Sequence, residues 1–196
     1  KDGVYTGVIF EYENNDKSYE KQWHATSVKR NTREKTNGKE ISVGVIGSGL
    51  FAKSLLLPAL TKIKNIHLHT LATTSGTSSY FNSNKFSFQE PASTNYKEVI
   101  ENKEIESVII LTPHSTHSRM AIEALNEKKH VYVEKPLTHT VEEARLLTEA
   151  ARKAGVITQM GNQGHSNEGT RLTKEWLQAG VLGEIREVHS WTNRPV

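Results

Sequence analysis

A glycine-rich turn follows an apolar run at residues 43–52, VGVIGSGLFA, and it constrains the fold of this chain more than any other feature. Gly47 allows a sharp turn out of a predicted strand, and Gly49 leaves no side chain between the backbone and a bound phosphate. Ala52 lets the next helix pack close to the sheet, and the N–H groups of its first turn face the phosphates. The pattern predicts a dinucleotide site, although an ordinary strand–turn–helix can carry the same glycines.

Short apolar segments alternate with helical patterns from Ile41 onward, which is typical of a parallel sheet covered on both faces. The sequence therefore predicts an α/β fold with a doubly wound parallel sheet and helices on both faces. Residues 74–94 are expected to form a loop with one short helix. Strands are expected at residues 41–46, 66–73, 107–111, 130–133 and 156–160. Helices are expected to start after Gly49, at Tyr96, at Ser115 or Thr116, at Thr140 and at Ser166.

Two of these helices carry clear local signals. Pro58 lies inside the first and is expected to kink or restart it. Thr140 at the N-cap and Glu143 three residues later form a predicted capping box, and Gly155 is expected to end that helix.

Composition restricts the class of protein. A chain of 196 residues can bury one good core and part of a second. The absence of cysteine excludes disulfides, thiolate metal sites and cysteine nucleophiles. No apolar run approaches the roughly 20 residues of a membrane span, so no membrane association is expected.

The net charge of +3 does not indicate a nucleic-acid partner, because the excess lies in one polar stretch, residues 29–39. A solvated linker explains such a stretch more simply than a phosphate-binding surface, so no nucleic acid is expected. A cytoplasmic location is the default, with export left open because the first residue is Lys1 rather than Met.

The end of the second predicted strand bears on the cofactor. An acidic residue there normally binds the adenosine ribose of NAD. No Asp or Glu occurs between Glu40 and Glu90, and the strand runs instead into Thr73, Thr74 and Ser75. Hydroxyl groups can donate hydrogen bonds to a 2′-phosphate, which a carboxylate would repel. This slightly favours NADP, or the use of both NAD and NADP. The alternative is that NAD binds without the carboxylate.

Glu134, Lys135 and Pro136 directly follow another predicted parallel strand. Ligands bind beyond the carboxyl ends of such strands. A lysine held there can bind a substrate hydroxyl and pass its proton while hydride leaves the adjacent carbon. By spacing alone, such a tripeptide is more often a surface turn.

Four motifs together resemble those of one protein family. They are Gly47-Ser48-Gly49-Leu50-Phe51-Ala52, Thr112-Pro113-His114 with His117, Glu134-Lys135-Pro136-Leu137, and residues 179–185, AGVLGEI. Over roughly residues 40–196 the chain resembles the N-terminal half of the Gfo/Idh/MocA oxidoreductases.

The resemblance implies a Rossmann domain followed by an α/β substrate domain, and NAD(P)-linked chemistry at a carbon of a sugar, polyol or cyclitol. Lys135 matches the family's catalytic lysine. The resemblance places Gly47, Gly49, Leu50 and Phe51 against the cofactor diphosphate, and Thr112, Pro113 and His117 beside its ribose. At the nicotinamide end it places Glu134, Lys135, Asn162 and Gln163.

Three domain segments are expected. Residues 1–40 are expected to form a tail or linker, because most of them are polar or charged and show no clear period, and residues 4–12 could form one strand. Residues 1–137 are also similar to the second module of bacterial proteins in which a zinc-type alcohol dehydrogenase comes first. The resemblance implies that the strand at 4–12 is the end of that earlier module. Residues 41–165 form the dinucleotide-binding domain. Residues 166–196 are expected to form an interface helix and the first strand of a truncated substrate domain. Residues 138–196 are more similar to a stand-alone subgroup of bacterial proteins that are often exported.

Within that last segment, Trp176 and Leu177 are expected in the core, and alternation predicts a half-buried strand at residues 184–192. We expect the chain to bind cofactor but to lack a complete active site, and the full-length protein to be a homo-oligomer.

Two other function classes stay open. Some relatives are glycoside hydrolases that retain NAD, and others bind NAD(P) as regulators without turnover. Accumulation of reduced cofactor separates the oxidoreductase from the hydrolase, and the presence of Lys135 argues against the regulator. No metal is expected, because neither the pair His67 and His69 nor the pair His114 and His117 has a third ligand at suitable spacing.

Overall fold

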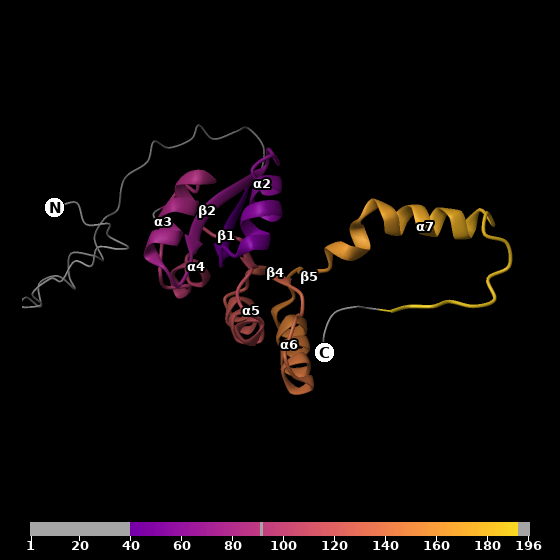
Figure 1. The fold of residues 1–196 in the computed structure, drawn as a ribbon. Helices are drawn as coiled ribbons and strands as arrows, with labels where there is room; N and C mark the ends of the chain where they lie inside the picture. The colour runs from indigo at the N-terminus through magenta and orange to yellow at the C-terminus, as the bar shows by residue number, and fades with distance from the viewer. Residues whose placement is uncertain (1–39, 91, 192–196) are drawn as a thin grey trace, which may run out of the picture.

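A five-stranded parallel sheet forms the centre of the molecule (Figure 1). The computed structural model describes residues 40–90 and 92–191. The sheet order is β2-β1-β3-β4-β5, and all neighbouring strands are parallel. The strands are β1 (Ile41–Ile46), β2 (Ile66–Ala72), β3 (Ser107–Ile110), β4 (His130–Glu134) and β5 (Thr158–Gly161). The predicted fold class is confirmed, with β5 beginning two residues later than expected.

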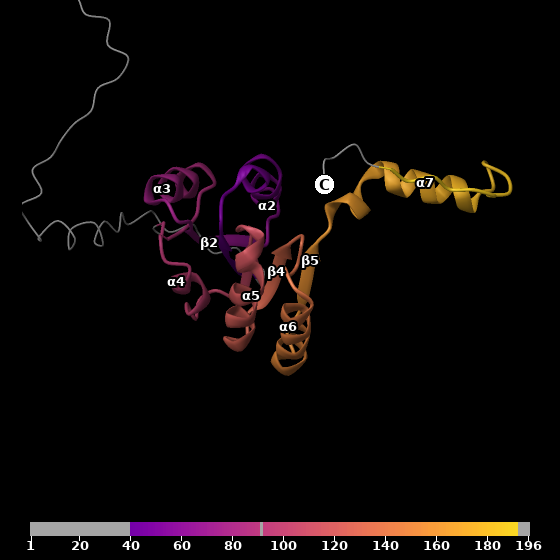
Figure 2. The same ribbon diagram turned by 60° about the horizontal axis from the view of Figure 1, so that its bottom comes forward.

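Helical segments connect the strands across both faces of the sheet, with α2 and α3 on one side and α4, α5 and α6 on the other (Figure 2). They are η1 (Ala52–Leu56), α2 (Leu57–Leu60), α3 (Gly76–Lys85), α4 (Lys97–Ile100), η2 (His114–Thr116), α5 (His117–Asn126), α6 (Val141–Ala154), η3 (Gln163–Ser166) and α7 (Glu168–Gln178). In the described part of the chain, no helix is both long and apolar enough to cross a membrane.

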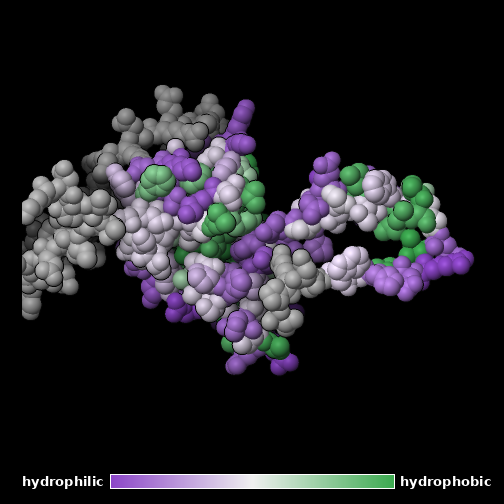
Figure 3. Space-filling view, viewed as in Figure 1, coloured by the Kyte–Doolittle hydropathy of each residue, from purple (hydrophilic) through white to green (hydrophobic). Residues whose placement is uncertain are grey.

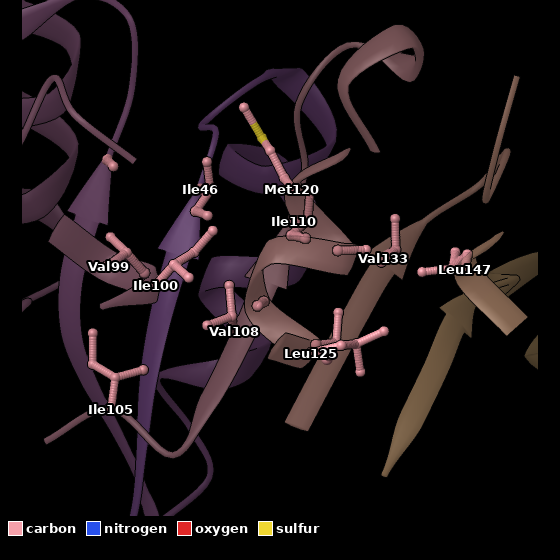
Figure 4. Packing of buried hydrophobic residues seen from close by; sticks show 14 residues of the cluster. Ile46, Val99, Ile100, Ile105, Val108, Ile110, Met120, Leu125, Val133 and Leu147 are labelled. Atoms are coloured by element: carbon pink, nitrogen blue, oxygen red, sulfur yellow. The ribbon is translucent and has the colours of Figure 1, made fainter. Parts of the chain in front are cut away.

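Alternating side chains of the strands divide the core into two clusters. On β3, Val108 and Ile110 pack into one cluster and Ile109 into the other. Figure 4 shows the first cluster, in which Met120 and Leu125 of α5 lie against the strands. Burial on both faces explains why these strands are nearly continuous apolar runs.

The first helical segment restarts at Pro58, as predicted. Residues 52–56 form a turn of π-helix, and α2 then begins with Pro58 in its first turn. At α6 the capping box is also confirmed, because Thr140 accepts from the Glu143 N–H and the Glu143 carboxylate accepts from the Thr140 N–H. Gly155 ends α6 in the left-handed conformation, with a φ of +66°.

The prediction for residues 74–94 underestimated α3, which is 10 residues long. Its buried residues are polar, namely Ser79, Asn82 and Ser83, so the segment lacks the apolar stripe by which an amphipathic helix is recognised. Beyond α3, Gln89, Glu90 and Ser93 lie along the outer edge of β2, where their N–H groups donate to the carbonyls of Leu68, His69 and Leu71 at 2.9–3.0 Å.

Two helices begin close to their predicted starts but differ in their capping contacts. Asn167 rather than Ser166 caps α7, and its side chain accepts from the Thr170 N–H at 2.8 Å. Thr116, one of the two predicted starts, holds the N-cap position of α5, but its hydroxyl donates to the loop before it, to Thr112 Oγ1 at 2.6 Å and to Pro113 O at 2.7 Å.

The segment from α7 to residue 191 projects away from the sheet (Figure 1). Trp176 and Leu177 are 51% and 47% exposed, so their predicted place in the core is wrong. Exposed hydrophobic residues gather at the end of this segment that is farthest from the sheet (Figure 3). Val181 and Leu182, which follow α7, are both exposed. The predicted strand at 184–192 is not formed over its described residues 184–191, because no described segment pairs with it. The strand predicted at 4–12 lies outside the described residues.

Candidate functional site

A cavity opens at the carboxyl ends of β1, β2 and β3. Strand order reverses at β1, whose neighbours are β2 on one side and β3 on the other, and such switch points are where ligands bind in open α/β sheets. The cavity has a volume of about 460 Å³, within the usual range for small-molecule sites of ~300–1,000 Å³. Its walls are Ile46, Gly47, Ser48, Gly49, Ala72, Thr73, Thr74, Ser75, Ser78, Thr94, Tyr96, Leu111, Thr112, Pro113 and Met120.

The two glycines of the first loop meet different surroundings. Gly47 has a φ of +96°, and a Cβ there would lie 2.7 Å from Leu111 O. At Gly49 a Cβ would meet no heavy atom within 4 Å, so its backbone is open to a ligand. Leu50 follows at the start of the helix and is 81% exposed, and Phe51 is half-buried. Gly47 thus serves the turn, while Gly49 leaves access.

Polar side chains tie the first loop to α3. The Asn82 amide donates to Ser48 Oγ at 3.2 Å and to Ser78 O at 2.8 Å. The hydroxyls of Ser48 and Ser78 lie 3.4 Å apart. Sequence reasoning missed Ser78 and Asn82, and no local signal distinguishes them from the other polar residues of that segment.

Hydroxyl groups line the cavity where β2 ends. Thr73 Oγ1 donates to Ser75 O at 2.8 Å, and Ser75 Oγ caps α3 by accepting from the Ser78 N–H. The N-terminus of α3 therefore lies beside Thr74 at the cavity wall. None of the lining residues carries a charged side chain.

Tyr96 forms part of the wall and was not anticipated from the sequence. Its hydroxyl donates to Glu123 Oε1 at 3.2 Å, and the Arg119 guanidinium lies 5.7 Å from the centre of its ring. Burial, followed by the hydrogen bond to Glu123, raises the pKa of Tyr96 above its usual 10.0. Its phenol therefore stays neutral near pH 7 and presents an aromatic surface to the cavity.

His117 does not line the cavity but lies beneath it, with no exposed surface. Its Nδ1 is 2.7 Å from Pro136 O, and its Nε2 is 2.8 Å from Thr112 O. Thr112 and Pro113, the other two residues of the predicted ribose contact, are in the cavity wall.

A second cluster lies beyond the ends of β4 and β5. The Glu134 carboxylate accepts from the Tyr132 hydroxyl at 3.4 Å and from the Gln163 amide at 3.1 Å. Burial, and then the charge of Glu134, raises the pKa of Tyr132 above its usual 10.0. Lys135 is exposed and joined to Pro136 by a cis peptide bond. Of the residues predicted beside Lys135, Gln163 contacts Glu134 directly, and Asn162 is exposed at the end of β5.

Apart from the buried His117, the structure therefore divides the predicted cofactor residues into three groups. Those in the cavity wall are Gly47, Gly49, Thr73, Thr74, Ser75, Thr112 and Pro113. Leu50 and Phe51 begin the adjacent helix, and the cluster around Glu134 lies one strand further along the sheet. Among residues 40–90 and 92–191, no group of three or more His, Cys, Asp or Glu side chains is arranged to hold a metal ion.

Comparison with known families bears on this arrangement directly. The model of the Gfo/Idh/MocA family, described as an oxidoreductase family with an NAD-binding Rossmann fold, matches residues 41–162. The chain belongs to this family. The matched residues contain β1 to β5 and hence the whole cavity, so the cavity is that of a Gfo/Idh/MocA NAD-binding domain.

The matches to individual relatives cover only part of each relative's length. The chain is similar to scyllo-inositol 2-dehydrogenase (NAD(+)) of Bacillus subtilis, with 39% identity over 87 residues, which are 44% of this chain and 25% of that protein. It is 30% identical to 1-carboxy-3-chloro-3,4-dihydroxycyclohexa-1,5-diene dehydrogenase of Comamonas testosteroni, over 76% of this chain and 37% of that protein.

A solved structure with a similar fold is a 3-ketoreductase from Actinomadura kijaniata in complex with TDP-benzene and NADP. Its TM-score is 0.69 at 29% identity, and the match covers 75% of this chain and 46% of that one. The chain thus spans less than half the length of these three relatives.

Proposed function

We propose that this chain is the cofactor-binding part of an oxidoreductase that transfers a hydride between nicotinamide and a carbon of a sugar, polyol or cyclitol. The cavity at the β1–β3 switch point is the observation that carries the proposal. Its wall combines an open backbone at Gly49 with the start of a helix and with uncharged hydroxyl groups. A diphosphate needs this combination of N–H donors without neighbouring carboxylates.

The nicotinamide end of the cofactor would lie toward Glu134 and Lys135. A bound nicotinamide dinucleotide supplies the hydride acceptor or donor. Lys135 Nζ would hold the substrate hydroxyl and exchange a proton with it as the carbon changes oxidation state. Glu134, held by Tyr132 and Gln163, would fix the polar side of this pocket.

We propose a slight preference for NADP over NAD. A 2′-phosphate would approach Thr73, Thr74 and Ser75 at the N-terminus of α3, where no lining residue carries a negative charge to repel it. The helix end adds N–H groups with positive electrostatic potential. The bound NADP named for the ketoreductase structure supports this preference.

The remaining parts of the prediction concern the whole protein. We propose that residues 41–165 are the dinucleotide-binding domain and that residues 166–196 begin the substrate domain. On this proposal the chain binds cofactor without turning over substrate, and the full-length protein is a homo-oligomer. The dehydrogenase and reductase names of the relatives favour net redox chemistry over the retained-NAD hydrolase and the regulator.

Titration by calorimetry with NADPH and NADH tests the proposal, with the change Gly49→Asp as the decisive variant. The fold has room for a Cβ at this position, and the new carboxylate would stand where the diphosphate binds. Binding of both nucleotides should fall at least tenfold, while the midpoint of urea unfolding stays the same.

The matched control is Gly169→Asp. A Cβ at Gly169 meets Asn167 Oδ1 at an ordinary contact distance of 3.5 Å, and this residue of α7 belongs neither to the cavity wall nor to the cluster around Glu134. Its affinities should equal those of the unaltered chain. Failure of the unaltered chain to bind either nucleotide at millimolar concentration would overturn the proposal.

A further inference from the structure

His117 links two loops that belong to different parts of the proposed site. It begins α5 and is fully buried. One ring nitrogen faces the carbonyl of Thr112 after β3, and the other faces the carbonyl of Pro136 after β4. Carbonyl oxygens only accept hydrogen bonds, and a neutral imidazole has one N–H, so a neutral His117 ring donates to one of these carbonyls and contacts the other.

The two carbonyls that His117 contacts are close in sequence to functional groups. Thr112 is in the wall of the cofactor cavity. Pro136 directly follows Lys135, whose exposed side chain depends on its backbone for its position. The His117 ring, with contacts of 2.7 Å and 2.8 Å to these two carbonyls, therefore sets the distance between the cavity wall and the backbone of Lys135.

We infer that His117 is a positioning residue that places the Glu134–Pro136 loop against the nicotinamide end of the cofactor. This inference rests on the proposed function. It also replaces the direct ribose contact expected for His117, since both ring nitrogens already face backbone carbonyls. If His117 had a purely structural role, its replacement would lower only the stability of the fold. If it positions the loop, its replacement should weaken binding of the nicotinamide half of the cofactor more than binding of the adenosine half.

Variants of His117 separate these roles. His117→Phe keeps the ring volume in the buried space but removes both ring nitrogens. His117→Gln retains one donor group and should restore part of the effect. Ile105→Ala is the matched control, because Ile105 is also fully buried in the first core cluster but precedes β3, at the opposite end of that strand from Thr112.

The experiment compares each dinucleotide with the same molecule lacking nicotinamide. Calorimetry pairs NADPH with 2′-phospho-ADP-ribose, and NADH with ADP-ribose. In His117→Phe the affinity for the two ADP-ribose compounds should stay within twofold of that of the unaltered chain. The ratio of dinucleotide affinity to ADP-ribose affinity should fall about fivefold, the effect of roughly one hydrogen bond. His117→Gln should give a ratio between those of the unaltered chain and His117→Phe, and Ile105→Ala should lose stability without changing the ratio of the two affinities.

A second measurement uses the chain without ligand. Nuclear magnetic relaxation of the Lys135 and Leu137 amides should show increased motion in His117→Phe and no increase in Ile105→Ala. Equal losses for both halves of the cofactor, or no change in the Lys135 amide, would overturn the inference. If the unaltered chain binds none of the four compounds, the proposed function fails, and the relaxation measurement still decides whether His117 positions the loop.

Discussion

The change Gly47→Ala should destabilise the protein, whereas Gly49→Ala, two residues later, should not. Gly47 has a φ of +96°, which side chains with a Cβ rarely adopt, and its Cβ would lie 2.7 Å from Leu111 O and 2.8 Å from Leu111 C. The obstruction is backbone at the end of β3, so no flexible side chain can move aside. Gly49 has open space at the same position.

The magnitude follows from these two costs. Backbone strain of this kind is worth about 1–3 kcal/mol, and relief of an overpacked contact costs about 1–3 kcal/mol more. Together they lower the free energy of unfolding by about 2–6 kcal/mol, a large share of the ~5–15 kcal/mol that stabilises a typical domain. For Gly49→Ala the expected change lies within about 0.5 kcal/mol.

Urea unfolding followed by far-ultraviolet circular dichroism measures both variants. The Gly47→Ala midpoint should move to a lower urea concentration with an unchanged slope, and the Gly49→Ala midpoint should stay where it is. Equal midpoints for the two variants would refute the reasoning, because the chemical change is the same and only the surroundings differ.

Three further predictions concern other parts of the molecule. Thr140→Ala removes the capping box of α6 and should cost about 1 kcal/mol in thermal unfolding, whereas Thr148→Ala, within the same helix, should cost less. Burial lowers the pKa of Lys129 from its usual 10.5, so the unfolded chain binds more protons between the lowered value and 10.5, and stability should rise with pH through that window. Lys129→Met should abolish this rise, while Lys128→Met should keep it. In the full-length protein, Lys135→Ala should reduce kcat by about 10²–10⁴, and unaltered kcat would refute its catalytic role.

The sheet could be predicted because its strands carry their own signal. Apolar runs such as residues 107–110 are buried on both faces, and they stand between recognisable helix ends. The capping box at Thr140 and the glycine at 155 act within one or two turns of chain, so their outcome was local. By contrast, α3 was underestimated because its buried face is made of serine and asparagine.

Of the residues that line the cavity, those in the loops after strands were singled out from the sequence. Those that come from other segments of the chain were not. Gly47, Thr73 and Thr112 follow consecutive strands and meet at one sheet edge. Tyr96 and Ser78 reach the same cavity from segments without a distinctive pattern. Trp176 and Leu177 have the spacing of a buried stripe, but a stripe is buried only where another surface covers it.

The sequence by itself determined the order of strands and helices, the glycine turn at the cofactor cavity and the lysine after β4, because each depends on neighbouring residues. Only the tertiary structure decided how these parts are joined. The Asn82 amide meets Ser48 from 34 residues away, and the His117 ring meets the Pro136 carbonyl from 19 residues away. Such contacts form when strands assemble into a sheet and bring separate loops to one edge, and no spacing along the chain encodes them.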